Sequence, residues 1–171
     1  ALPILLAVID RLKLTHQQQL DFLFTAGAFG LVIANNASIS GAEGGCQAEV
    51  GSASAMASAA LVAASGGTPD QSAQAVAITI KNMMGLICDP VAGLVEVPCV
   101  KRNALGSSQA FISADMALAG IRSVIPPDEV IHAMYQVGRQ MPQIFKETAE
   151  GGLAVTPTAQ RLSKEILEKQ K

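Results

Sequence analysis

Apolar residues recur at helical spacing along most of the chain, and polar or glycine-rich runs separate the helical stretches. Residues 2–14 carry leucine and isoleucine on a helical period and end in a polar run. Thr15 can cap a second helix, which the pattern extends through residues 16–33. Two asparagines and a run of serine and glycine then predict a break over residues 35–45.

The middle of the chain predicts two more helices. One begins near Cys46, is rich in small residues and ends at the glycine pair 66–67. Thr68 starts the next, with proline at its first position and Gln71 placed to close a capping box. The pattern extends this helix to about Ile87.

The last part of the chain is irregular at first and helical afterwards. Prolines and glycines oppose a regular helix over residues 88–98. Residues 99–120 are expected to be helical, with an interruption near Gly106. Further helices are expected to start at the proline pair 126–127 and at residues 156–158, the last of them charged and exposed on the surface.

Composition supports one all-α domain. Hydrophobic residues make up 50% of the chain and aromatic residues only 4%, so small and aliphatic side chains must fill the core. We therefore predict a single compact domain over residues 1–171, with about six to eight helices around an Ala/Leu/Met-rich core. The chain starts at Ala1 without a methionine, and we expect it to be a processed or excised piece.

Charge and hydropathy exclude two classes of partner. The formal net charge of -2 gives no electrostatic footprint for nucleic acid. The uncharged stretches 22–42 and 50–69 approach the length of a membrane span. The first ends in asparagine and serine, and the second is mostly alanine, serine and glycine, so we expect two buried helices and no membrane.

The three cysteines carry the candidate chemistry. Their spacing, C-x41-C-x10-C, matches no compact zinc or ferredoxin signature, and a free cysteine is commonly a small buried hydrophobe. Cys46 follows a glycine-rich loop and Cys99 follows a proline, so both are expected near helix N-termini, which stabilise thiolates. Lys101 and Arg102 add positive charge near Cys99, although such a pair can equally be a solvated first turn.

Three segments carry a resemblance to a known family. They are SISGAEGGCQAEVG at 38–51, CDPVAGLVEVPCVKRN at 88–103 and ADMALAGI at 114–121. They closely resemble the iron–sulfur L-serine dehydratases of bacteria, specifically their alpha chain or catalytic domain. The resemblance extends over essentially the whole chain, including residues 150–154 and 156–158.

The resemblance implies a cofactor and an activity. It implies a [4Fe-4S] cluster held by the thiolates of Cys46, Cys88 and Cys99. Because the chain has no fourth cysteine, one iron is left open as a Lewis acid toward the serine hydroxyl. The implied reaction converts L-serine to pyruvate and ammonia without pyridoxal phosphate. A related cluster lyase acting on cysteine and a helical zinc-binding or structural module stay open as alternatives.

The resemblance also implies partners, and the cysteine count favours a compartment. The full enzyme of this family has additional sequence before this region and a beta chain or second domain, so we expect an oligomer, and this piece can be inactive alone. A total of three cysteines, an odd and widely spaced set, favours a reducing cytoplasm. In that compartment the thiols remain available for metal or catalysis.

Substrate and proton-transfer residues are assigned from local chemistry. Backbone N–H groups at a helix start form an anion site, although the glycines can equally mark a tight turn. The expected contacts to the substrate carboxylate are Ser38, Ser40, Gly41, Gly44 and Gly45, followed by Lys101, Arg102 and Asn103. The general base stays unassigned; its candidates are Glu43, Glu49, Asp89, Glu96 and Lys101, or a residue of the partner. His16 and His132 lie in helical patterns and are expected to be surface or packing residues.

Overall fold

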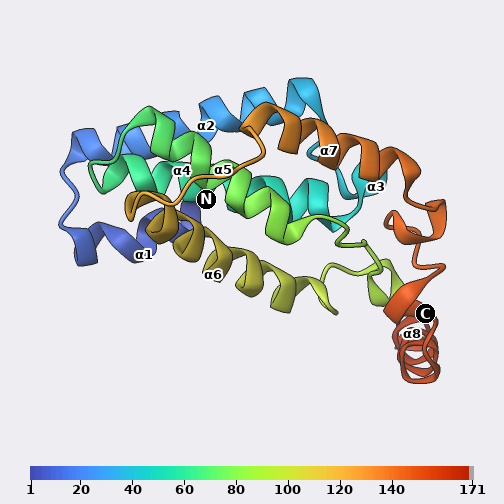
Figure 1. The fold of residues 1–171 in the computed structure, drawn as a ribbon. Helices are drawn as coiled ribbons and strands as arrows, with labels where there is room; N and C mark the ends of the chain where they lie inside the picture. The colour runs from blue at the N-terminus through green and yellow to red at the C-terminus, as the bar shows by residue number, and fades with distance from the viewer. Residues whose placement is uncertain (170–171) are drawn as a thin grey trace.

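The computed structural model describes residues 1–169 and shows an all-α fold, as the sequence predicts (Figure 1). Within these residues there are eight α-helices and no strand. The α-helices are α1 (Leu2–Leu12), α2 (His16–Asn36), α3 (Gly41–Gly44), α4 (Ser52–Ala64), α5 (Pro69–Met83), α6 (Cys99–Leu118), α7 (Pro127–Gln140) and α8 (Pro157–Lys169). Four short turns join them: the π-helix η1 (Gln47–Gly51) and the 3₁₀ turns η2 (Val91–Gly93), η3 (Gln143–Phe145) and η4 (Gly152–Val155). The last two residues, part of the predicted C-terminal helix, lie outside the described chain.

Both predicted threonine caps are confirmed. The hydroxyl of Thr15 accepts a hydrogen bond from the Gln18 amide at 3.3 Å, and the Gln18 side chain accepts one from the Thr15 amide at 2.9 Å. Thr68 and Gln71 form the same reciprocal pair, at 3.2 and 2.9 Å. Each capping box satisfies two N–H groups that a helix start leaves without partners, and so fixes where α2 and α5 begin.

Two predicted boundaries are wrong. Helix α5 ends at Met83 rather than near Ile87, because the next residue is extended and Gly85 has a φ of +86°. Helix α6 runs unbroken through Gly106, where an interruption was expected. A Cβ at Gly106 would lie 2.8 Å from a methyl carbon of Val50, so this glycine serves close helix packing rather than a break.

Helix α4 lies at the centre, where α2, α5 and α6 pack around it (Figure 1). Most of its residues are buried alanines and serines, which let these neighbours approach closely. The prediction of a buried helix is therefore confirmed for α4. It is wrong for one face of α2, where Phe24 is 73% exposed and Leu31 is 67% exposed. Within residues 1–169, no helix is both long enough and apolar enough to cross a membrane.

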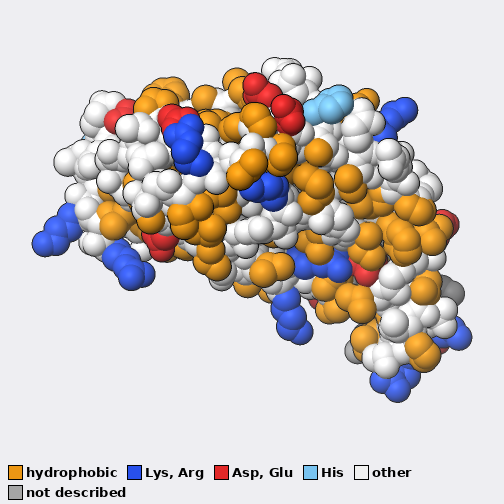
Figure 2. All heavy atoms as spheres, viewed as in Figure 1, with side chains coloured by type: hydrophobic (Ala, Val, Ile, Leu, Met, Phe, Trp, Pro, Cys, Tyr) orange, Lys and Arg blue, Asp and Glu red, His pale blue; other side chains and the backbone are white. Residues whose placement is uncertain are grey.

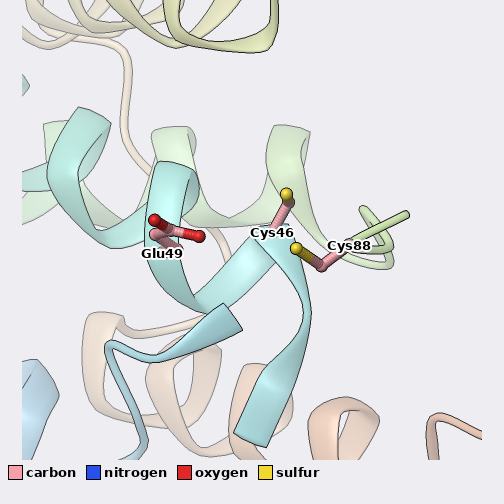
Figure 3. Close-up of side chains that lie close together, drawn as sticks. All are labelled: Cys46, Glu49 and Cys88. Carbon is pink, nitrogen blue, oxygen red and sulfur yellow. The ribbon is translucent and has the colours of Figure 1, made fainter. Parts of the chain in front are cut away.

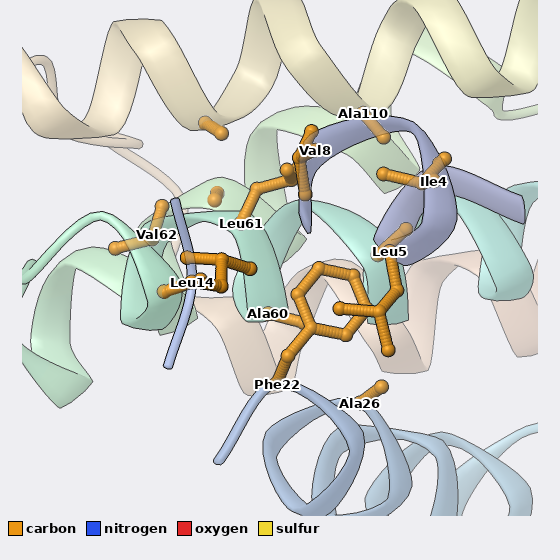
Figure 4. Close-up of a cluster of buried hydrophobic side chains, with 14 of the residues drawn as sticks. Ile4, Leu5, Val8, Leu14, Phe22, Ala26, Ala60, Leu61, Val62 and Ala110 are labelled. Carbon is orange, nitrogen blue, oxygen red and sulfur yellow. The ribbon is translucent and has the colours of Figure 1, made fainter. Parts of the chain in front are cut away.

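The core consists of three clusters of buried hydrophobic side chains. One cluster packs α1 against α2, α4 and α6 around Phe22 (Figure 4). A second joins α2, α4, α5 and α7 around Ile33 and Ile80. A third, smaller cluster contains Cys46 and Cys88 and borders the candidate site. Lysine and arginine side chains are scattered over the face shown in Figure 2 rather than gathered into a patch.

Candidate metal centre

Cys46 is held in the interior by the glycine before it. Gly45 ends α3 with a φ of +76°, a conformation that glycine adopts without strain. A Cβ at this position would lie 2.9 Å from the Leu86 carbonyl oxygen and 2.6 Å from the Met141 sulfur. The chain therefore turns sharply against its neighbours, and Cys46, only 2% exposed, enters η1 facing inward.

Gln47 connects the Cys46 segment to the rest of the site, and nothing in the sequence pattern signals this role beyond its position next to a cysteine. Its side chain is fully buried and donates to the Met134 carbonyl at 3.0 Å. The side-chain oxygen Oε1 of Gln47 accepts from the Gly85 backbone amide at 2.8 Å. The backbone amide of Gln47 donates to the Leu86 carbonyl at 2.9 Å. These bonds connect η1 to α7 and to the segment that leads into Cys88.

Cys88 lies between α5 and η2, clamped by a distant segment. Its amide donates to the Phe145 carbonyl at 2.9 Å, and its carbonyl accepts from the Glu147 amide at 3.0 Å. Glu147 has a φ of +66°, which is uncommon for a residue with a side chain. The Cys88 thiol is buried at 3% exposure, so both its backbone and its side chain have a fixed place.

Cys99 completes the set from a third element. Cys99 is half-buried and is the first residue of α6, at the helix start that the sequence predicts after Pro98. The three cysteines line one cavity of about 20 Å³. The other lining residues are Glu49, Val50, Pro90, Val95, Asn103 and Glu147. Three thiols that lie far apart in the sequence are thus brought to one place.

Arg102, one of the two basic residues expected near Cys99, forms an ion pair beside this cavity. Arg102 Nη1 lies 2.5 Å from Asp89 Oδ1, and the Asp89 side chain is 1% exposed. The same nitrogen donates to the Ile87 carbonyl at 2.8 Å and lies 3.9 Å from Cys46 Sγ. Asp89 Oδ2 accepts from the Leu153 amide at 2.7 Å. Asp89 and Arg102 therefore join the Cys88 loop to α6 and to η4.

Burial governs the protonation of the cysteines. Burial raises the pKa of Cys46. Hydrogen bonds with Cys88 and Arg102 act in the opposite direction and offset part of this increase. Burial also raises the pKa of Cys88, and the neighbouring Cys46 raises it further. The pKa of Cys99 is raised by burial as well, although Arg102 opposes the change. The expected stabilisation of thiolates by helix starts is therefore outweighed by desolvation, so a metal that binds here must displace protons.

Two carboxylates face the same cavity. In Figure 3 the sulfurs of Cys46 and Cys88 lie side by side, and a carboxylate oxygen of Glu49 extends toward them. A Cβ on Gly41 would lie 2.8 Å from Glu49 Oε2, 3.3 Å from Cys88 Sγ and 3.5 Å from Glu147 Oε2, so this glycine leaves room for all three. Burial raises the pKa of Glu49, and the charge of Glu147 raises it further. Sequence reasoning missed Glu147.

A larger cavity of about 430 Å³ is lined by residues of α3 and α7. It is lined by Ser38, Glu43 and Gly44 from the predicted set, together with Arg139 and Lys146. The Ser38 hydroxyl donates to Glu43 Oε2 at 2.5 Å. This cavity contains no cysteine, so we place the chemistry in the smaller cavity, where the metal-binding donors converge.

The remaining predicted residues do not line the cysteine cavity. Ser40 precedes α3, and its amide donates to the Ser38 hydroxyl at 3.1 Å. Lys101 and Glu96 are exposed and do not line the cysteine cavity. His16 and His132 are exposed at the surface of α2 and α7. The structure thus gathers the cysteines, Gly41, Glu49, Arg102 and Asn103 but not the whole predicted set.

Comparison with known proteins identifies the family. The family model described as serine dehydratase alpha chain matches residues 1–154. The chain is 68% identical to the probable L-serine dehydratase, alpha chain, of Bacillus subtilis, over 95% of this chain and 54% of that protein. It is 54% identical to the L-serine dehydratase, alpha chain, of Peptoniphilus asaccharolyticus, over 88% of this chain and 51% of that protein.

A third relative shows a similar match over a smaller share of its length. L-serine dehydratase 1 of Escherichia coli is 47% identical, over 78% of this chain and 30% of that protein. The chain spans about half the length of the Bacillus and Peptoniphilus relatives. Because the match to the family model covers nearly the whole chain, the chain belongs to the serine dehydratase alpha chain family.

Proposed function

We propose that this chain provides the iron–sulfur site of an L-serine dehydratase, which converts L-serine to pyruvate and ammonia. The observation that carries the proposal is the convergence of Cys46, Cys88 and Cys99 on one cavity from three separate segments. The names of the family and of its relatives supply the substrate. The relatives are longer than this chain, so we also propose that a further domain or beta chain completes the enzyme.

The donor set fits a [4Fe-4S] cluster with one open iron. Cys46, Cys88 and Cys99 would hold it, and the described cavity lining offers no fourth thiol. When bound, the cluster supplies a Lewis acid for departure of the serine hydroxyl. Arg102, whose guanidinium lies 3.9 Å from Cys46 Sγ, would offset part of the negative charge of the thiolates.

The reaction needs a group that takes the α-proton. Of the predicted candidates, Glu49 lines the cysteine cavity, whereas Glu43, Asp89, Glu96 and Lys101 do not. We therefore assign proton removal to the Glu49 carboxylate. Loss of this proton and of the hydroxyl gives 2-aminoacrylate and water, and the imine tautomer is then hydrolysed to pyruvate and ammonia.

The substrate carboxylate needs a neighbouring donor. Asn103 lines the cavity and its side-chain amide can donate hydrogen bonds. Gly41 borders Cys88 and exposes backbone rather than a side chain at that point. We assign the carboxylate contact to these two residues, and Lys101 serves as a comparison because it is exposed outside the cavity.

The test is a turnover assay with the complete enzyme. The chain, joined to the rest of the protein and reconstituted anaerobically with iron and sulfide, should release pyruvate from L-serine. Glu49→Gln should keep the cluster colour and lose turnover, while Lys101→Ala should keep both. Sulfide release from L-cysteine that exceeds pyruvate release from L-serine would support a cysteine lyase instead. Cluster colour without product from either amino acid would contradict the proposal.

A further inference from the structure

Two cysteines and one carboxylate form a tighter group than the three cysteines do. One ligand atom each from Cys46, Glu49 and Cys88 lies within 4.8 Å of the other two (Figure 3). Cys99 lines the same cavity but falls outside this group. Cys46 and Glu49 are three residues apart on the turn that contains η1, which places both side chains on the side facing Cys88.

The backbone holds these donors in place. Cys88 is clamped on both sides by its hydrogen bonds to Phe145 and Glu147. The Gln47 amide donates to the Leu86 carbonyl at 2.9 Å and so ties the Cys46 turn to the chain just before Cys88. Donors that are already positioned bind a metal without the entropic cost of ordering them.

The donor chemistry selects the cation. Thiolate sulfur favours borderline and soft metals, and zinc takes a mixture of cysteine and carboxylate ligands in tetrahedral sites. Calcium and magnesium require oxygen ligands and are therefore poor candidates. Two thiolates and one carboxylate carry three negative charges, and Arg102, 3.9 Å from Cys46 Sγ, compensates part of the excess over a divalent ion.

The size of the cavity favours one ion. Its volume of about 20 Å³ corresponds to about one water molecule. A single cation, completed by water, fits this space as it stands.

We propose that Cys46, Glu49 and Cys88 bind a single divalent cation, zinc above all, and that this ion competes with assembly of the cluster. Ion binding stands on the geometry alone, whereas the competition rests on the proposed function. The two states differ in their ligands. The single ion needs Glu49 but not Cys99, and the cluster needs Cys99 but not Glu49.

The experiment uses the tag-free chain, reduced and free of oxygen, titrated with cobalt(II) as a spectroscopic probe. We expect one cobalt per chain, a sulfur-to-cobalt charge-transfer band, and displacement of cobalt by zinc. Glu49→Gln should weaken zinc binding about tenfold or more. Cys46→Ser and Cys88→Ser each leave one thiolate and should lower the charge-transfer band by at least half. Cys99→Ser should bind the metal within about twofold of the unmodified chain, a difference of about 0.4 kcal/mol.

Circular dichroism of each variant checks that it folds, and the reconstitution arm uses iron and sulfide. There Cys99→Ser should lose the cluster and Glu49→Gln should retain it, while zinc added first should block assembly in the unmodified chain. A zinc affinity that is unchanged in Glu49→Gln overturns the single-ion site. So does a zinc affinity that falls as far in Cys99→Ser as in Cys46→Ser. Zinc binding as expected in a chain that never assembles a cluster would contradict the proposed function and leave the ion site standing.

Discussion

Replacing Asp89 with asparagine removes the charge from a buried ion pair while keeping the size of the side chain. Asp89 accepts from Arg102 through one oxygen, at 2.5 Å, and from the Leu153 amide through the other, at 2.7 Å. Asparagine has one acceptor oxygen, so its NH₂ group must face one of these two donors. The substitution therefore leaves either a buried amide or a guanidinium without its partner.

The size of the loss follows from burial. Removing one partner of a buried pair costs about 3–5 kcal/mol. The Arg102 side chain is 15% exposed and keeps its bond to the Ile87 carbonyl, which favours the lower end of that range. We expect Asp89→Asn to lower the free energy of unfolding by about 3 kcal/mol and Tm by roughly 6–12 °C for a domain of this size.

Urea unfolding at neutral pH measures this loss, and Asp70→Asn is the matched control. Asp70 forms an ion pair with Arg122 at the same distance, 2.5 Å, but their side chains are 53% and 65% exposed. The control should lose much less stability, and its effect should shrink as salt rises. A loss for Asp89→Asn below about 1 kcal/mol, or equal to that of the control, would refute the reasoning.

Three further substitutions, two beside the site and one at the start of α5, are checked by the same unfolding measurement. Gly45→Ala should lower the free energy of unfolding by about 2–4 kcal/mol, because it adds backbone strain and overpacking. Its control, Gly66→Ala, has a φ of +81° and no neighbour within 4 Å, so it should cost only about 1 kcal/mol. Equal losses would show that the close contacts at Gly45 do not matter. Gln47→Ala should cost about 2–4 kcal/mol because the buried Met134 carbonyl and the partly buried Gly85 amide lose their partners, and an unchanged midpoint would contradict that role. Thr68→Ala should cost about 1 kcal/mol through loss of its capping box, and a loss restored by serine but not by valine would confirm that the hydroxyl acts as the cap.

The fold was predictable where local chemistry decides it. The caps at Thr15 and Thr68 act within four residues, so the sequence alone identifies them. The continuity of α6 at Gly106 depends on Val50, which lies far away in the chain. Helical periodicity carries no information about such a tertiary contact. From the sequence alone a glycine suggests a helix break, whereas in the structure it leaves room for a neighbouring side chain.

The site was predictable in its donors and less so in its surroundings. The three cysteines stood out by their helix-breaking neighbours and by the resemblance to the family. Gln47 and Glu147 act through bonds to Met134 and to the Cys88 carbonyl, which only the folded chain brings close. Arg102 was expected to contact substrate; its Nη1 lies beside Asp89, and its part in substrate binding stays a prediction.

We propose that Cys46, Cys88 and Cys99 jointly hold an iron–sulfur cluster. The most direct measurement is iron and acid-labile sulfide per chain after anaerobic reconstitution of the unmodified chain and of the three single cysteine-to-serine variants. We expect about four iron and four sulfide in the unmodified chain, with a brown colour that air bleaches, and loss of this stoichiometry in every variant. An unmodified chain that takes up iron without sulfide under these conditions, or a variant that keeps the full complement, would contradict the claim.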